Sequence, residues 1–242
     1  MTTLTKLIVS TILALLLFSC EFSTNWNSGI KGDGNVITKE RPVEGSFNEI
    51  HVSRGLDVYL TPADTDKVII EADGNLHDII TTHIDNNVLK ITAEENIGTA
   101  SSKKVLVNFK NAHKIVATSG SDVYSTKTIT TENLKLETNS GSDMNLDLNV
   151  NSLVCLATSG SDLELTGKVT NLDAEANSGS DIDAADLQAH TSNVKATSGA
   201  SVSVNTSKEL IASANSGGDV IYFGNPEKLE KTEGVSGEIR KK

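Results

Sequence analysis

The sequence predicts an all-β protein whose main domain is a right-handed parallel β-helix, a solenoid with about 20 residues in each coil. Two observations predict this fold. A short phrase built on Ser-Gly recurs six times in the second half of the chain, and apolar residues alternate with polar ones on both sides of each copy. The composition agrees, because aromatic residues make up only 4% and the 18 glycines favour strands and turns over helices packed on bulky side chains.

The repeated phrase is Thr or Asn followed by Ser-Gly-Ser-Asp and an apolar residue in four of its six copies. Successive glycines of the phrase are 21, 19, 19, 20 and 18 residues apart. A fixed period of this length is typical of solenoids, in which each repeat buries its apolar face against the next. The expected turn glycines are Gly120, Gly141, Gly160, Gly179, Gly199 and Gly217.

Apolar residues stand three and five positions after each glycine, and the same parity holds three and five positions before it. A period of two indicates a strand with one buried face on either side of the turn. Stacked coils about 4.8 Å apart would pair each strand with its equivalents above and below. Ile129, Val150 and Val169 predict a short third face, so three sides and a right-handed crossover are expected. Cys155 lies on an inward row and is expected to be a buried hydrophobic residue.

The N-terminal half fits the same rule around Gly55, about three periods before Gly120. Further coils are therefore expected, in chain order, at residues 68–72, 88–92 and 105–109. This assigns residues 44–225 to one β-helix domain. The charged residues 226–242 depart from the repeat and are expected to form a C-terminal cap or tail that protects the open end of the solenoid.

The N-terminus resembles an export signal with a lipidation site. Lys6 precedes an apolar run that is too short to span a membrane as a helix, and the run ends in Leu17-Phe-Ser-Cys20, which resembles a bacterial lipobox. We therefore expect residues 1–19 to be a lipoprotein signal peptide, Cys20 to carry the lipid, and residues 20–43 to be mostly a tether that ends in a first strand around Gly34–Thr38. The alternative is an ordinary secretory signal in which Cys20 is incidental. The expected location is the cell envelope, with the lipid as the membrane partner and the membrane leaflet left open.

The charge of the chain excludes one class of partner. The formal net charge is −11, and the sequence contains no basic run. Nucleic-acid binding requires clustered Lys and Arg, so no nucleic-acid partner is expected. A glycan or an envelope protein remains the expected kind of ligand, and the oligomeric state stays open.

One carboxylate occupies the same position in most coils, and stacking would place neighbouring copies about 5 Å apart. The favoured interpretation is structural, with Ser hydroxyls and turn amides bonding each Asp. The alternatives are a Ca²⁺ site, the only cofactor the sequence suggests, and unrelieved repulsion with raised pKa values. These residues are Asp122, Asp143, Asp162, Asp181 and Asp219.

Stacked acids also raise the alternative of a carbohydrate-active enzyme, a polysaccharide lyase or hydrolase. Two carboxylates about 5 Å apart resemble a retaining glycosidase, and the best pairs are Asp162 with Glu164 and Asp181 with Asp183. Few aromatic residues and short connections argue against a sugar cleft. The five histidines show no metal-site spacing. We therefore expect a protein that is not an enzyme and has no catalytic residues.

The lipobox, the segment from Arg41 to Val58, and the Ser-Gly-Ser-Asp turns together resemble the family called putative auto-transporter adhesin, head GIN domain. The resemblance covers roughly residues 44–225. It implies a right-handed β-helix in a lipoprotein of Bacteroidetes-like bacteria, with a role in adhesion, ligand binding or envelope structure.

Overall fold

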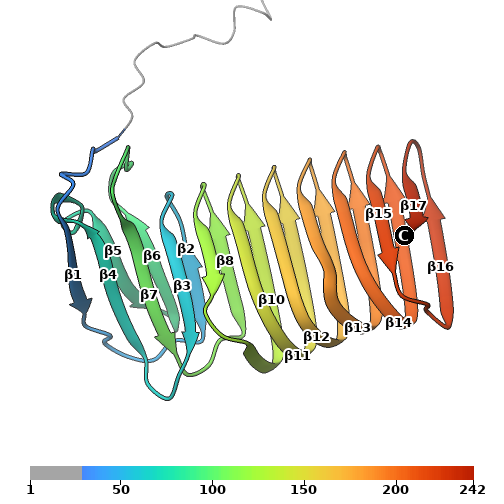
Figure 1. The fold of residues 1–242 in the computed structure, drawn as a ribbon, viewed down its shortest axis with the longest axis horizontal. Helices are drawn as coiled ribbons and strands as arrows, with labels where there is room; N and C mark the ends of the chain where they lie inside the picture. The colour runs from blue at the N-terminus through green and yellow to red at the C-terminus, as the bar shows by residue number, and fades with distance from the viewer. Residues whose placement is uncertain (1–28) are drawn as a thin grey trace, which may run out of the picture.

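The computed structural model describes residues 29–242, which form 17 strands and one short 3-10 helix. All strands belong to one continuous sheet that winds into a solenoid (Figure 1). The predicted β-helix is confirmed, whereas the signal peptide and Cys20 lie outside the described residues. The strands are β1 (Val36–Arg41), β2 (Glu49–Val52), β3 (Asp57–Pro62), β4 (Lys67–Asp73), β5 (Ile80–Asp85), β6 (Val88–Ala93), β7 (Lys103–Phe109), β8 (Lys114–Thr118), β9 (Asp122–Ser125), β10 (Ile129–Asn139), β11 (Asp143–Thr158), β12 (Asp162–Asn177), β13 (Asp181–Thr197), β14 (Ser201–Asn215), β15 (Asp219–Phe223), β16 (Lys228–Glu233) and β17 (Glu238–Lys241); the helix η1 is Gly74–Leu76.

From β8 onward the coils stack in chain order, and each strand pairs in parallel with its equivalent in the next coil. The long strands β11 to β14 each contain the end of one coil and the start of the next. Pairing between β12 and β13 is interrupted after Glu164 and at Thr170, which divides the coil into segments 162–164, 166–169 and 171–177. These segments correspond to the three expected faces.

The interior of the solenoid is filled by the apolar rows that the sequence pattern identifies. The row three residues after each turn glycine is at most 1% exposed. Cys155 is also buried, with a free thiol. Burial, assisted by the nearby carboxylate of Asp173, raises the pKa of the Cys155 thiol, so the thiol stays neutral in the core. The buried row consists of Val123, Met144, Leu163, Ile182, Val202 and Val220.

The order of the first coils differs from the expected order. The coil of β2 and β3 contains Gly55, and it lies between the coil of β6 and β7 on one side and the coil of β8 and β9 on the other. Along the chain, the coil of β2 and β3 comes first. The coil of β6 and β7 then lies on its N-terminal side, and the chain next passes to β8 and β9 on the opposite side. Residues 68–72 are not a coil in the parallel stack, because β4 runs antiparallel to β7. The alternation of apolar and polar residues indicates which side chains face inward, but it does not indicate which coils lie next to each other.

Antiparallel strands close the N-terminal end of the solenoid. Strand β5 folds back on β6 through Asn86 and Asn87, which both have positive φ (49° and 63°), the φ pattern of a type I′ hairpin turn. On another face, β4 pairs with β7, and β1 pairs with β4. These antiparallel strands cover the coil of β6 and β7, which is the outermost parallel coil at this end (Figure 1).

Residues 29–41 belong to this cap, which corrects the expected tether for the described part of residues 20–43. Strand β1 is paired along its whole length, and Ile30 forms a bridge to Ile97. The buried carboxylate of Asp73 accepts main-chain hydrogen bonds from Gly34, Ser101 and Ser102, each at 3.1 Å. Burial alone would raise the pKa of Asp73, but these three N–H donors hold it below its ordinary value.

The C-terminal segment also differs from expectation, because residues 226–242 continue the solenoid. Strand β16 pairs in parallel with β14, and β17 pairs in parallel with β15. Lys231 and Glu233 align with the inward residues Ala212 and Ala214 of the preceding coil. Charged residues are tolerated at these inward positions because both side chains are exposed, with no coil of residues 29–242 above them. The segment therefore caps the described coils.

One substitution pair tests the assignment of inward and outward positions. Leu163→Asp places a carboxylate in the apolar interior between two coils and should lower the free energy of unfolding by about 3 kcal/mol or more. Glu164→Lys, at the neighbouring exposed position, should change it by less than about 1 kcal/mol. Urea unfolding measures both values. Equal losses in the two variants would contradict the assignment.

Candidate binding surface

The Ser-Gly turns stack along one edge of the solenoid. The six predicted glycines have φ between 66° and 75°, and the serine before each also has positive φ. Glycine adopts this conformation without the steric cost that a Cβ brings. The turns are joined between coils, since the N–H of Gly120 donates to the carbonyl of Ser140 at 3.1 Å and the N–H of Gly160 donates to that of Ser178 at 3.2 Å. These glycines therefore shape and join the coils.

The second serine of the phrase is a buried structural residue that the sequence analysis missed. The hydroxyl of Ser142 donates to the carbonyls of Asn139, in the same turn, and of Ala117, in the preceding coil. It also accepts the N–H of Asn139 at 3.1 Å. Parity could have identified this position, because it is two residues before an inward apolar residue. The fully buried members of this row are Ser121, Ser142, Ser161 and Ser180.

The five predicted aspartates align in one outward row, which the strand register extends to Asp57 and Glu238 and interrupts at Ser201. The expected bonds from turn hydroxyls to these carboxylates are replaced by the hydroxyl bonds to main-chain carbonyls described above. Among residues 29–242, no three His, Cys, Asp or Glu side chains converge as metal ligands.

The aligned carboxylates repel one another. Partial burial raises the pKa of Asp162, and the neighbouring charges of Asp143 and Asp181 raise it further. The main-chain N–H of Asp181 offsets part of this increase, as the expected turn amides would. The pKa of Asp122 is raised by burial and by Asp57 and Asp143, and Lys103 offsets part of this effect. Lys103 lies 3.0 Å from a carboxylate oxygen of Asp57, and Arg240 lies 3.1 Å from a carboxylate oxygen of Glu238. Among the described residues, the close cationic partners of the row are therefore at its two ends.

The pairs considered for an enzyme lie on the same outer face as this row. Glu164 accepts a hydrogen bond from the side-chain amide of Asn145 at 2.6 Å. Asp162, Glu164, Asp181 and Asp183 do not line the groove described below or four other hollows on the described surface. The structure thus places these carboxylates on an open strand surface.

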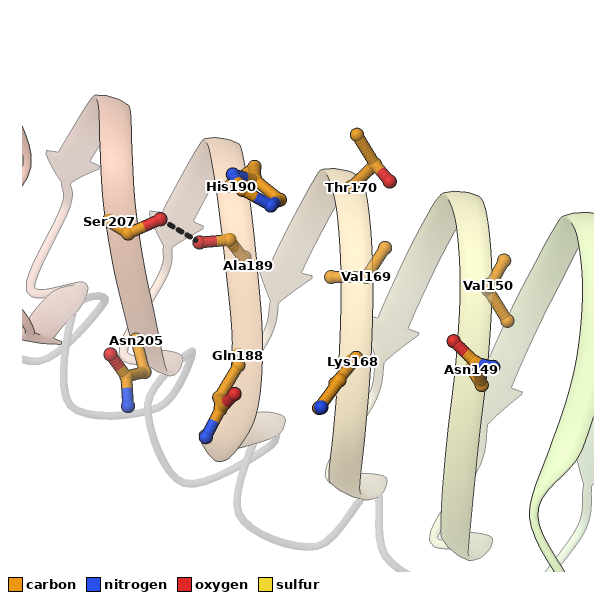
Figure 2. Close-up of a pocket in the computed structure, with 10 residues that line it drawn as sticks. All are labelled: Asn149, Val150, Lys168, Val169, Thr170, Gln188, Ala189, His190, Asn205 and Ser207. Atoms are coloured by element: carbon orange, nitrogen blue, oxygen red, sulfur yellow. Dashed lines mark hydrogen bonds between the residues drawn. The ribbon is translucent and has the colours of Figure 1, made fainter.

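A groove of about 590 Å³ crosses strands β11 to β14 on the short third face, and we call it the coil groove (Figure 2). It is lined by polar side chains over a floor of small apolar residues. None of its lining residues is acidic. They are Asn149, Val150, Lys168, Val169, Thr170, Gln188, Ala189, His190, Asn205 and Ser207.

The register of the strands arranges these residues in rows along the solenoid. One outward row consists of Asn149, Lys168, Gln188 and Asn205, which are paired in succession. Val150, Val169 and Ala189 form the buried floor beside it, each at most 4% exposed. A second polar row contains Thr170, His190 and Ser207 (Figure 2). The repeat pattern does not identify this groove, because its outward residues lie where the coils differ from one another.

Some polar groups of the groove already have partners in the protein, and others are available to a ligand. Asn205 donates to the carbonyl of Ala185 at 3.2 Å, and Ser207 donates to the carbonyl of Ala189 at 3.1 Å. Within residues 29–242, no side-chain hydrogen bond engages Asn149 or Gln188, and Lys168 has no carboxylate partner within 4.0 Å. The coil groove therefore offers unpaired amides and an unpaired cation.

Residues 46–226 match the family described as putative auto-transporter adhesin, head GIN domain, and the chain belongs to this family. The resemblance stated from the sequence is confirmed. No curated protein matches the sequence.

Several solved structures of bacterial proteins have a similar fold. A putative adhesin from Bacteroides fragilis has a TM-score of 0.81 at 19% identity, over 88% of this chain and 100% of that chain. A putative lipid binding protein from Parabacteroides distasonis has a TM-score of 0.71 at 20% identity, over 88% and 99% of the two chains. A putative adhesin from Parabacteroides merdae has a TM-score of 0.69 at 18% identity, over 88% and 98%. At these identities the similarity establishes the shared fold.

Removal of one charge tests the repulsion within the aspartate row. The raised pKa of Asp162 means that the ionised carboxylate is less favourable in the folded chain than in the unfolded chain. Asp162→Asn should therefore stabilise the protein at neutral pH and low salt by about 0.5 kcal/mol, and less in high salt. The gain should vanish as the pH falls below 3.8, where both states are protonated. Denaturant unfolding at several pH values and salt concentrations measures it.

Asp64→Asn is the matched control, because Asp64 is exposed and lies outside the row. A melting temperature that rises with millimolar Ca²⁺ in the wild type and not in the Asp162→Asn variant would contradict unrelieved repulsion and would indicate a cation between the carboxylates.

Proposed function

We propose that this protein is a non-enzymatic, lipid-anchored solenoid of the cell envelope that binds a glycan or an envelope protein through its outer surface. The observation that carries this proposal is the stacking of coils, which repeats outward side chains in register over the length of the domain. Solenoids use such extended surfaces to bind partners. The family description, which names an adhesin, supports a surface or envelope location.

Two features support binding rather than catalysis. The candidate carboxylate pairs lie on an open strand surface outside the hollows described above, whereas hydrolysis needs a substrate held between its acid and its nucleophile. The relatives of similar fold are described as putative adhesins or as a putative lipid binding protein, and both descriptions concern binding. The proposed anchor rests on the sequence alone. No helix within residues 29–242 is long and apolar enough to cross a membrane.

The anchor is tested by Cys20→Ser. Loss of the thiol removes the site of lipidation, so the variant should leave the membrane fraction or accumulate with its signal peptide uncleaved. Cell fractionation and mass spectrometry of the mature N-terminus measure this outcome. Wild-type protein that carries no lipid and fractionates like the variant would refute the anchor.

The binding role is tested with the purified Cys20→Ser chain. It should bind to isolated cell envelopes or to a component on a glycan array, with no turnover of acidic polysaccharides. Surface plasmon resonance and a reducing-sugar assay measure the two activities. The same chain denatured in urea is the unfolded control. Release of reducing ends that is lost in Asp162→Asn and kept in Asp64→Asn would replace the binding role with an enzymatic one.

A further inference from the structure

We propose that the coil groove is the ligand site of this protein and that it binds a linear acidic oligosaccharide, such as a chain of uronic acid residues. This inference rests on the binding role proposed above and adds the location of the site and the chemical class of the ligand. The charge, the spacing and the free polar groups of the groove favour this ligand.

The charge of the groove is opposite to that of the protein as a whole. The chain has a net charge of −11, yet the lining of the groove contains Lys168 and no carboxylate. The flanking acids Asp147 and Asp186 each lie two residues before a lining residue, and Asp147 accepts hydrogen bonds from the hydroxyls of Thr128 and Thr166. An anion would be repelled along the aspartate row and can approach Lys168 in the groove.

The spacing of the groove suits an extended polymer. Its outward row runs from Asn149 to Asn205 through four consecutive coils, which is a length of about 14 Å at about 4.8 Å per coil. One coil step is comparable to the length of one pyranose residue. A linear oligosaccharide lying along the solenoid axis could therefore place successive sugars over successive coils.

The available groups favour a glycan over a peptide. The main-chain groups of β11 to β14 already pair with neighbouring coils, so an extended peptide cannot add to the sheet on this face. The amides of Asn149 and Gln188 both donate and accept hydrogen bonds, which matches sugar hydroxyls. The lining has no Phe, Tyr or Trp ring on which a neutral sugar could stack. Lys168 would instead bind a carboxylate of the sugar chain.

The test measures binding by isothermal titration calorimetry with the purified Cys20→Ser chain as the parent protein. The probes are tetragalacturonate, its methyl ester, which has the same sugars without the charges, and tetraglutamate as an acidic peptide. Lys168→Glu reverses the charge in the groove. Lys39→Glu is the matched control, because this substitution makes the same change in net charge. Lys39 is exposed on β1, at the N-terminal end of the solenoid. Thermal melts establish that both variants are folded.

Tetragalacturonate should bind the parent protein, and Lys168→Glu should weaken this binding about tenfold or more, while Lys39→Glu should change it less than about twofold. The methyl ester and tetraglutamate should both bind more weakly than tetragalacturonate. No binding of tetragalacturonate, or equal weakening by the two variants, would overturn the groove assignment. Tetraglutamate binding as tight as that of tetragalacturonate would overturn the glycan assignment.

These outcomes are separable from failure of the binding role itself. If the parent protein binds cell envelopes and Lys168→Glu binds them equally well, the groove assignment is wrong and the binding role stands. If the parent protein binds neither envelopes nor any of the three probes, both proposals are wrong.

Discussion

Main-chain pairing between successive coils is the constraint on which the rest of this structure depends. It places each residue above its equivalent in the next coil, with a step of about 4.8 Å. An amino-acid choice at one position is therefore repeated as a row. Apolar residues become a continuous core, the buried serines join each turn to the preceding coil, and the outward aspartates become a line of like charges. The core and the repulsion thus have the same geometric origin.

The same constraint makes the two ends of the solenoid special, because an unpaired coil exposes both strand edges and an apolar interior. The ends are closed by different means. At the N-terminus the chain reverses, so antiparallel strands β4, β5 and β1 cover the first parallel coil, and buried Asp73 bonds residue 34 to residues 101 and 102. At the C-terminus the coil geometry continues, but Lys231 and Glu233 replace inward alanines. Lys231 lies 4.7 Å from the ring centre of Tyr222, and Glu233 accepts the N–H of Ile239 at 2.9 Å.

The sequence predicts the fold best where the repeat is most regular. Strict alternation around Gly120 to Gly217 identifies the buried rows, because each coil there meets a nearly identical neighbour. Alternation around Gly55 identifies its buried residues equally well and still gives the wrong coil order, since inward facing carries no information about the adjacent coil. The Asp85-Asn86-Asn87-Val88 segment was the available signal, because two residues that tolerate positive φ between apolar strands predict a hairpin and thus a reversal. The coil groove could not be found in this way, because its outward residues follow no repeat, although Val150 and Val169 of its floor belong to the predicted third face.

The turn residues repeat from coil to coil and the outward residues of the groove do not, and this difference distinguishes the scaffold from the candidate site. The block around each turn is nearly constant because every coil must present the same inward surface to its neighbours. The outward row of the groove has no such requirement, and it holds an amide, an ammonium group and two further amides in Asn149, Lys168, Gln188 and Asn205. A repeated side chain can only offer the same contact at every step, whereas a row of different side chains can distinguish one position of a polymer from the next. Chemical selectivity in this solenoid is therefore expected where the coils differ, on the short third face, and the repeated Ser-Gly-Ser-Asp turns supply the rigid spacing that such selectivity needs.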